Sequence, residues 1–497
     1  ATTGNAISLG GSSNNTLSNI NATTTLGHAF YISGSSNNTI SNLNATSTNG
    51  GRGIYLDTNC KYNSFSIIRA TSTVGNAVSI ESNSDYNNIS NAVATATGAK
   101  TIYILSSFNN TLSGITATNT GSGAAIYLDA SSNNTLSGTN TSATTGKGIW
   151  LSTSSNNSIS NSNATVTTGI AIYLTGSSGN SLSGVNAAAT TSYAVYLASA
   201  SNYNAIANST ASATTGNAVY LATASAFNAF SGINATATSG SAVYLSSGSN
   251  NTFSGLNATA TTGYAVYLLS SPNNTVANSS AATDASAAVS IISSNSNTVM
   301  NTTLISANQT GILLNISSNS SGNTFYWNNF TATSGYYAAD LNGSNYYNSS
   351  AGGQNEGNAW PNVVNGSVNI IGTTASLAYP GLYAGLFGSG YPYNNTTALG
   401  KLLGNVVDYA PLTTISSPPC GNITVAGTAY TISANTTVNG TGCFNVHADN
   451  VSITCTGGAI TGNNTQGTYG IYSNASNTTI ANCTISNFSA AIGFDGP

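Results

Sequence analysis

Charged residues are scarce in this sequence. Only 3% of its 497 residues are Asp, Glu, Lys or Arg, and the formal net charge is -4. An ordinary soluble domain has about a quarter of its residues charged, so here hydroxyls, amides and attached sugar must keep the surface hydrated. Since the sequence has neither a basic stripe nor an acidic run, we expect no nucleic acid as a partner.

Long apolar runs are also missing. No stretch reaches the length of about 18 apolar residues that a membrane span needs, and no basic segment precedes the opening ATTGNAISL. The sequence therefore predicts no membrane insertion and no retained signal peptide. Apolar residues still make up 40% of the chain, and the polar remainder is Ser, Thr, Asn and Gly, which favours a packed core over disorder.

A short hydrophobic motif of the form IYL or VYL returns about every 23 to 24 residues. It begins at Ile7, Phe30, Ile54, Val78, Ile102, Ile126, Ile149, Ile172, Val195, Val219, Val243, Val266, Val289 and Ile312. Each repeat has the pattern of three short strands, with turns too brief for a crossover helix. Such strands can satisfy their backbone only by pairing with the same strand of the next repeat.

This periodicity predicts an all-β chain in three parts. Residues 1–335 would form a parallel β-helix (solenoid) of about fourteen rungs, and residues 336–419 an irregular Tyr- and Gly-rich cap or lateral module. Residues 420–497 would form a second β-helix segment that contains cysteines.

Alternation within the repeated strand places Val219 and Leu221 on one face and Tyr220 on the other. We expect the aliphatic residues inside and the rings outside. The outward positions then form a ridge, interrupted by Ser79, of Tyr31, Tyr55, Tyr103, Tyr127, Trp150, Tyr173, Tyr196, Tyr220, Tyr244 and Tyr267. The ridge is open to two interpretations: stacking that stabilises the solenoid, or a lateral contact or sugar-binding surface.

An asparagine occurs at the second turn of every repeat. The positions are Asn15, Asn38, Asn63, Asn87, Asn110, Asn134, Asn157, Asn180, Asn204, Asn228, Asn251, Asn274, Asn297 and Asn323. Asparagine tolerates left-handed turn geometry, and stacked amides can bond from rung to rung. We predict an asparagine ladder whose members carry no sugar.

Two other series of asparagines stand in N-glycosylation sequons. One directly precedes the ladder and comprises Asn14, Asn37, Asn109, Asn133, Asn156, Asn250 and Asn273; the other comprises Asn21, Asn44, Asn140, Asn163, Asn234 and Asn257. We predict covalent N-linked glycans at these positions. Because neighbouring rungs are only about 4.8 Å apart, occupancy should be partial or alternate.

Aromatic residues replace the sequon asparagine before the ladder in four repeats. We predict contact patches at these residues and a basic neighbour: Tyr62, Tyr86, Arg69, Tyr203 and Phe227. Nearby, Asp57 and Glu81 occupy the same place in consecutive repeats. Three interpretations stay open for that pair: ion pairing with basic residues, a protein contact, or a metal or catalytic site.

The motifs GIYL, SSNNTIS, SNNTLSG and VDYAPLT resemble the right-handed β-helix repeats named after the NosD periplasmic proteins, within the pectin-lyase-like solenoid class, as found in archaeal cell-surface proteins. The resemblance covers most of the chain and implies a right-handed parallel β-helix. Such repeats form a scaffold and do not specify an activity. A copper role finds no support, because His28, His447 and Met300 lie far apart in the sequence.

Pectate lyases and polygalacturonases share the solenoid class, and their chemistry needs clustered acidic residues. Here the acidic residues are scattered singly, apart from Asp57 and Glu81. We therefore expect no enzyme, no catalytic or metal site, and no cofactor beyond the covalent glycans.

The cysteines favour an oxidising environment. Cys455 and Cys483 occupy matching positions on successive rungs, close enough for a disulfide, which leaves Cys420 with Cys443 as the residual pair. Cys60 is then odd, and is either buried and free or available for an intermolecular bond.

Neither end of the sequence resembles a cap. We expect either self-association, with the last rung of one copy pairing head-to-tail with the first rung of the next, or a fragment of a longer chain. The sequence thus predicts a secreted structural glycoprotein of the cell surface, a subunit of an extracellular filament or sheath with lateral protein contacts. The alternatives are an adhesin or glycan-binding solenoid, and a polysaccharide lyase or hydrolase.

Overall fold

The computed structural model describes residues 1–306, 311–317, 319–331, 334–350, 353–415, 420–427, 429–432, 435–438, 440 and 442–495. It confirms an all-β parallel solenoid, with one short helix, α1 (Pro361–Val364), among the described residues. The chain forms two compact units, Ala1–Thr298 with Leu304–Ser321, and Val299–Thr303 with Gly322–Pro497. The predicted division into three parts stays a prediction, and its limit at 419 lies outside the described residues.

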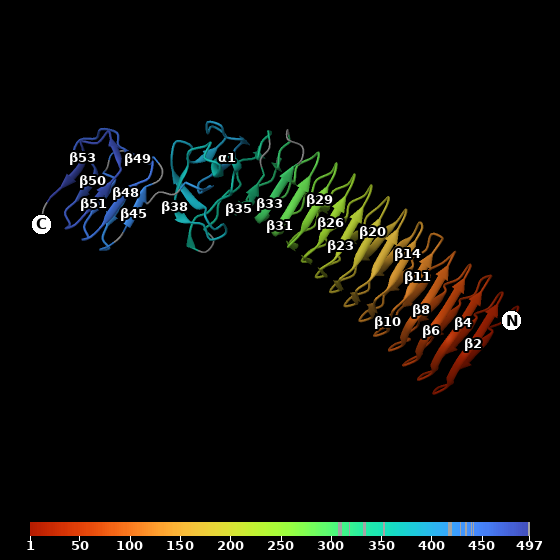
Figure 1. Cartoon of the computed structure of the whole chain (residues 1–497). Helices are drawn as coiled ribbons and strands as arrows, with labels where there is room; N and C mark the ends of the chain where they lie inside the picture. Colours follow the sequence, from red (N-terminus) through yellow and green to blue (C-terminus); the bar gives the residue numbers. More distant parts are fainter. Residues whose placement is uncertain are drawn as a thin grey trace. The chain divides into compact units, whose positions relative to one another are not determined.

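The first unit is a stack of parallel rungs, coloured from red to green in Figure 1, and its first face is one parallel sheet whose strands pair in sequence order. Its fourteen strands are β1 (Ile7–Gly10), β3 (Phe30–Ser33), β5 (Ile54–Asp57), β7 (Val78–Glu81), β9 (Ile102–Leu105), β12 (Ile126–Asp129), β15 (Lys147–Ser152), β18 (Ile170–Thr175), β21 (Val195–Ala198), β24 (Val219–Ala222), β27 (Val243–Ser246), β30 (Val266–Leu269), β32 (Val289–Ile292) and β34 (Leu314–Ile316).

The repeat period therefore predicted the rungs of this unit, with one anchor wrong. Leu314, not Ile312, pairs with Val289. The alternation explains the shift, because Leu314 and Ile316 are the residues of β34 that turn into the core.

The second and third faces follow each first-face strand. In some rungs a single long strand runs over both faces: β2 (Thr16–Thr24), β4 (Thr39–Ser47), β6 (Ser64–Ser72), β8 (Asn88–Ala96), β31 (Thr275–Thr283) and β33 (Thr298–Ser306), the last contributing residues to both units. In the other rungs the second face is β10 (Thr111–Ser113), β13 (Thr135–Ser137), β16 (Ser158–Ser160), β19 (Ser181–Ser183), β22 (Ala205–Ala207), β25 (Ala229–Ser231) and β28 (Thr252–Ser254). The matching third face is β11 (Thr116–Asn119), β14 (Asn140–Ala143), β17 (Asn163–Val166), β20 (Asn186–Ala189), β23 (Thr210–Ala213), β26 (Asn234–Ala237) and β29 (Asn257–Ala260).

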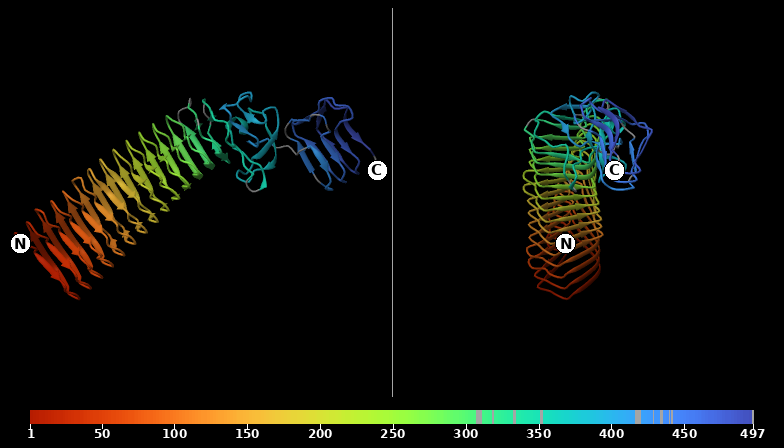
Figure 2. Two further views of the ribbon diagram at one scale, coloured as in Figure 1. Left: turned by 180° about the vertical axis from the view of Figure 1, so that it is seen from behind. Right: turned by 90° about the vertical axis from the view of Figure 1, so that its left-hand side faces the viewer.

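The core of this unit runs along the inside of the coil, and Figure 2 shows its rungs stacked one on the next. On the first face Val219 and Leu221 are buried and Tyr220 is half-buried, which confirms the predicted orientation. The second face contributes Phe230 and the third contributes Ala235. Each fully buried large aliphatic or aromatic side chain contributes about 1.5–3 kcal/mol.

The predicted asparagine ladder forms at the turn before the second face. The Oδ1 atom of Asn228 accepts hydrogen bonds from the backbone N–H and the Nδ2 of Asn204, at 2.9 and 3.1 Å. The same arrangement joins Asn63 to Asn87 and Asn251 to Asn274. The buried turn thus has its polar groups paired, and the rung spacing is fixed by side chains as well as by strands.

The second unit begins with irregular structure. Its strands here are β35 (Thr324–Tyr326), β36 (Asn329–Phe330), β37 (Ala338–Asp340), β38 (Ile371–Ala375), β39 (Tyr383–Phe387), β40 (Tyr393–Asn394), β41 (Leu402–Gly404), β42 (Val407–Asp408) and β43 (Leu412–Thr413). Strand β37 pairs in parallel with β41, whereas β39 is antiparallel to both β38 and β43.

The predicted second β-helix follows in the same unit, as three small parallel sheets. They comprise β44 (Gly421–Ile423), β47 (Phe444–Val446), β50 (Tyr469–Ser473) and β53 (Ala490–Phe494); β45 (Ala429–Ile432), β48 (Ser452–Cys455) and β51 (Thr479–Ala481); and β46 (Thr436–Thr437), β49 (Ala459–Thr461) and β52 (Thr484–Ser486). Both predicted disulfides, Cys420–Cys443 and Cys455–Cys483, are present and join neighbouring rungs.

Candidate functional site

An aromatic strip runs along the outer side of the first face. Its rings stack from Tyr103 to Tyr267, and for Tyr196, Tyr220 and Tyr244 the successive ring centroids are 4.9 Å apart with planes 5° and 7° from parallel. The ring spacing equals the spacing of the rungs, about 4.8 Å. The ridge predicted from the sequence is therefore confirmed as a continuous stack over these rungs.

The stack is interrupted where Ser79 replaces the ring. Ser79 is fully buried and its Oγ accepts a hydrogen bond from Asn76 Nδ2 at 2.9 Å. In the preceding rung, the guanidinium of Arg52 lies 3.8 Å from the centre of the Tyr55 ring. The last ring before the interruption, Tyr55, is thus in contact with a cation.

Arg52 is held by the carboxylate of the next rung. Its Nη2 lies 2.9 and 3.2 Å from the two Glu81 oxygens, and Tyr55 donates its hydroxyl to Glu81 Oε2 at 3.3 Å. Lys61 and Asp85 form a second ion pair, at 3.4 Å. Three interpretations were open for the Asp57 and Glu81 pair. For Glu81 the structure contains one of them, an ion pair with the basic residue Arg52.

The hydroxyl groups of three tyrosines of the strip donate hydrogen bonds to carboxylates. Besides Tyr55, Tyr31 donates to Asp57 at 3.3 Å and Tyr103 to Asp129 at 3.2 Å. Burial, followed by the nearby Glu81, raises the pKa of Tyr55, and burial followed by Asp129 raises the pKa of Tyr103. These phenols therefore stay protonated and act as donors.

His28 borders the same cluster. Burial, and then the positive charge of Arg52, lower the pKa of the imidazole. Its Nδ1 accepts the backbone N–H of Arg52 at 3.0 Å, and its ring contacts Tyr55 edge-on with centroids 5.0 Å apart. At neutral pH we expect a neutral ring with the proton on Nε2.

Cations repeat along one side of the strip. Lys100 Nζ lies 4.9 Å from the centre of Tyr103, and Lys147 Nζ lies 4.5 Å from the centre of Trp150. These cations occur on alternate rungs. Arg52 and Lys100 lie two residues before β5 and β9, and Lys147 is the first residue of β15. Sequence reasoning missed this row, although the spacing of these residues, two repeat periods apart, was the signal that could have found it.

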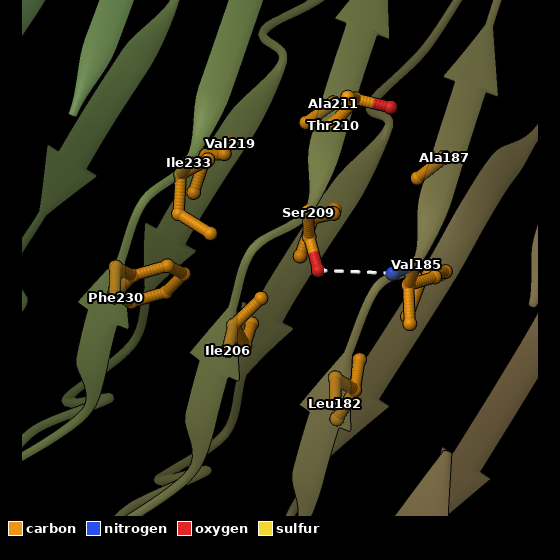
Figure 3. Close-up of a pocket in the computed structure, with 12 residues that line it drawn as sticks. Leu182, Val185, Ala187, Ile206, Ser209, Thr210, Ala211, Val219, Phe230 and Ile233 are labelled. Carbon is orange, nitrogen blue, oxygen red and sulfur yellow. Dashed lines mark hydrogen bonds between the residues drawn. The ribbon is translucent and has the colours of Figure 1, made fainter. Parts of the chain in front are cut away.

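No group of three or more His, Cys, Asp or Glu side chains within the described ranges is arranged to hold a metal ion. The interior of the coil is also filled. The gap shown in Figure 3 is about 10 Å³ in volume and apolar, lined by Leu182, Ile206 and Phe230, while Ser209 Oγ accepts the Val185 N–H at 3.1 Å. A space near the volume of one water leaves no room for a ligand in this gap.

Four exposed aromatic residues form two stacked pairs at the turn before the ladder. Tyr62 and Tyr86 are 57% and 47% exposed, with ring centroids 5.1 Å apart, and Tyr203 and Phe227 are 64% and 49% exposed at the same separation. All four have φ between 56° and 59°. A bulky residue in this left-handed region costs on the order of 1 kcal/mol more than Asn or Gly.

Arg69 does not join these aromatic pairs. It lies in the later half of β6, pairs in register with Asn44 and Val93, and is exposed on the third face. Between it and Tyr62 the chain bends at Ile67, whose side chain is 62% exposed with a φ of 55°. The predicted contact residues therefore lie on different faces of the coil; whether any of them binds a partner stays a prediction.

The sequon asparagines lie on the outside of the first unit. Those before the ladder occupy the same left-handed turn position as the aromatic pairs, with φ from 55° to 63°. The second series stands at outward positions of the third face. Eleven of the thirteen predicted carriers are exposed, and the remaining two, Asn109 and Asn250, are half-buried.

The fifth cysteine is a buried free thiol. Cys60 Sγ lies 3.1 Å from the backbone oxygen of Asp57, and burial raises its pKa. Of the two predicted states, buried and free is confirmed.

The second unit contains three buried carboxylates that sequence reasoning missed. Asp340 and Glu356 accept hydrogen bonds from neighbouring side chains and backbone. Asp408 accepts the backbone N–H groups of Asn358 and Ala410 and the indole of Trp360 at 2.8–2.9 Å. Complete burial raises the pKa of Asp408 to about 6.

Within the described part of the chain, no helix has both the length and the apolar character needed to span a membrane. Comparison with curated proteins finds no similar sequence. A family model described as a right-handed β-helix region matches residues 62–211 and 193–358.

Several solved structures are similar in fold. The A-module of a mannuronan C-5 epimerase from Azotobacter vinelandii is 11% identical with a TM-score of 0.40, and the match covers 62% of this chain and 88% of that one. The Dettilon tailspike protein is 13% identical with a TM-score of 0.37, covering 62% of each chain. A DFA-IIIase from Arthrobacter chlorophenolicus is 11% identical with a TM-score of 0.24, covering 61% of this chain and 69% of that one.

These likenesses correct the expectation that the chain is no enzyme. Two of the three structures are enzymes, so the β-helix architecture gives no ground for excluding catalysis. At such low identity, and with TM-scores below 0.5, they carry no substrate or residue role to this chain.

The two family matches together span more than half of the chain. They overlap in the middle of the first unit, where the rungs, the ladder and the inward aliphatic columns repeat without a break. The chain belongs to the right-handed β-helix family.

Proposed function

We propose that this protein is an extracellular structural glycoprotein of the cell surface whose first unit carries N-linked sugar on its outer faces. The observation that carries the proposal is the placement of the sequons. They form two outward columns along the first unit, and eleven of the thirteen predicted asparagines are exposed. With so few charges on the surface, attached sugar supplies the hydration that charged residues provide elsewhere.

The two disulfides support folding outside the cytoplasm. Cys420–Cys443 and Cys455–Cys483 link successive rungs of the second β-helix. Disulfides of this structural kind form and persist in oxidising compartments.

Glycopeptide mass spectrometry of the protein isolated from its native source tests the glycoprotein proposal. We expect sugar on exposed sequon asparagines such as Asn14, Asn37 and Asn133. The ladder asparagines stand outside sequons, and all of them except Asn15 are buried, so they should be unmodified. If all thirteen carriers are unmodified, the proposal is wrong.

The finer proposal is a filament formed by stacking of β-helices. Every rung of the first unit pairs with the next in a constant register, Val219 with Val243 and Val243 with Val266, so a rung of another copy can continue the same pattern. Electron microscopy of the native assembly is expected to show unbranched filaments. Dispersed single particles at high protein concentration would exclude this arrangement.

A second candidate is binding of a carbohydrate along the aromatic strip. Tyrosine hydroxyls, carboxylates and cations lie together there, in the cluster of His28, Arg52, Tyr55 and Glu81. Such groups can bond sugar hydroxyls while the rings contact apolar sugar faces. A glycan array probed with the protein and with a Tyr31→Ser, Tyr55→Ser variant tests this, because both hydroxyls bond carboxylates of the cluster; equal binding by both proteins would reject the cluster as the site. Incubation with polyuronides tests the same preparation for cleavage or epimerisation.

A further inference from the structure

The exposure of the sequon asparagines before the ladder depends on the preceding rung. Asn37, Asn133, Asn156 and Asn273 each follow a rung with asparagine at this position, and all are exposed. Asn109 follows Tyr86 and Asn250 follows Phe227, and these two are half-buried. The rungs are direct neighbours, since the backbone N–H groups of Tyr86 and Phe227 bond Phe108 O and Ser249 O at 3.2 Å.

Within each aromatic pair, the first ring packs on one face of the second ring. Tyr62 stacks on Tyr86 with planes 13° from parallel, and Tyr203 stacks on Phe227 with planes 8° from parallel. The stacking therefore holds the plane of the second ring roughly perpendicular to the axis of the solenoid. The other face of the second ring is directed toward the next rung, where the sequon asparagine stands.

We propose that Tyr86 and Phe227 are platforms for the first sugar residues of the glycans on Asn109 and Asn250. This inference rests on the proposed glycoprotein function and deepens it. A pyranose has an apolar C–H face that packs on the negative face of an aromatic ring, and the attachment to Asn brings the sugar to the ring without loss of translational freedom. The packing covers an apolar ring that is otherwise half-exposed, and it orders two glycans of the column.

The geometry accounts for aromatic residues in a turn position that favours asparagine. A ring at φ near 57° is unfavourable by itself, and these rings occur as adjacent pairs whose second member, Tyr86 or Phe227, is followed by a sequon asparagine. The four aromatic residues are therefore not distributed at random along the column of glycan positions. Tyr86 and Phe227 lie one rung before Asn109 and Asn250, where a sugar can pack on them, and Tyr62 and Tyr203 lie one rung earlier still.

Hydroxyl-radical footprinting of the glycosylated protein tests the proposal, because oxidation reports the accessibility of each ring. The variant Thr252→Ala removes the Asn250 sequon while leaving the asparagine and its turn in place, and Thr252 is exposed. We expect oxidation of Phe227 to rise about twofold or more in the variant, since the ring face becomes uncovered. Oxidation of Tyr203 should not change, because its other neighbour in the column is Gly179, which carries no sugar.

Thr111→Ala provides the same test for Tyr86 and Asn109, and Thr135→Ala, which removes the Asn133 sequon, is the matched control that should change neither ring. Sugar on Asn109 and Asn250 with unchanged oxidation of Phe227 and Tyr86 would overturn the inference. So would sugar on Asn133 and Asn156 with none on Asn109 and Asn250, although the proposed function would then stand. Absence of sugar from all these sites would reject the proposed function itself.

Discussion

Arg52 Nη2 lies 2.9 Å from Glu81 Oε1, which joins two adjacent rungs at the point where the aromatic strip is interrupted. Glu81 is 6% exposed, so the ion pair takes the place of the water that an exposed carboxylate would contact. In a chain with six basic residues, two pair with buried acids, Arg52 with Glu81 and Lys61 with Asp85. The strip is therefore continued across Ser79 by an ion pair in place of a ring.

Replacing Arg52 should destabilise these rungs locally. Arg52→Ala leaves the carboxylate of Glu81 nearly buried without its ion pair and removes the cation from the face of Tyr55. We expect a loss of about 1–3 kcal/mol, since an unpaired buried charge is costly. Hydrogen exchange of the amides in β5 and β7 measures it. Lys61→Ala breaks the more exposed Lys61–Asp85 pair and should cost less than about 1 kcal/mol; equal effects would contradict this account.

Removing one ladder asparagine should weaken the coil at that rung. Asn204→Ala leaves the backbone N–H and the Nδ2 of Asn180 without their acceptor, which they reach at 2.9 and 3.0 Å. Two unsatisfied buried donors cost on the order of 2–4 kcal/mol. Faster hydrogen exchange in the rungs on either side is the expected result, and Asn163→Ala, at an exposed outward position, should leave exchange within about 0.5 kcal/mol of the parent.

The second unit should lose stability as the pH rises. Its Asp408 has a pKa of about 6 in the folded state, above the value of 3.8 for a free side chain. A raised pKa means that the folded state holds the proton more tightly, so this contribution is present below pH 4 and is lost as the pH rises through 6. The full loss is roughly 3 kcal/mol. Urea unfolding of the second unit from pH 4 to 7.5 measures it, and Asp408→Asn should remove this component of the pH dependence. A pH dependence that is the same in the variant would assign it to other groups.

The disulfide between Cys455 and Cys483 should stabilise the second β-helix. It closes a loop of 28 residues, which corresponds to about 3–4 kcal/mol from restriction of the unfolded chain. The Cys455→Ser, Cys483→Ser variant should be cleaved by protease within residues 442–495 at lower urea concentration than the parent. The first unit supplies the control, because its fragments should appear at the same urea concentration in both proteins.

The period of the repeats predicted most of the first unit. A residue's neighbour in space is the residue one repeat further along, so Asn204 could be paired with Asn228, and Tyr220 stacked on Tyr244, from the sequence alone. The same reasoning missed the row of Arg52, Lys100 and Lys147, because these residues recur every second repeat. It also placed the last anchor at Ile312, because the step from Val289 to Leu314 is two residues longer than the step from Val266 to Val289.

The irregular part of the second unit could not be predicted in this way. Asn358 bonds to Asp408, 50 residues away, and Tyr393 to Asn362, 31 residues away. Neither separation repeats elsewhere, so no period indicates the partner. The buried carboxylates there depend on tertiary contacts that the local sequence does not specify.

The left-handed turn before the ladder separates the surface of this protein from its core. The position accepts Asn14, Gly179, Tyr203 and Phe227 alike, while the ladder asparagine beside it and the inward residues beyond it keep the same arrangement. A substitution at this turn changes the outer surface of one rung without requiring a new core. The coil can therefore acquire or lose a sugar or a ring at intervals of one rung, and its outer surface can evolve faster than its fold.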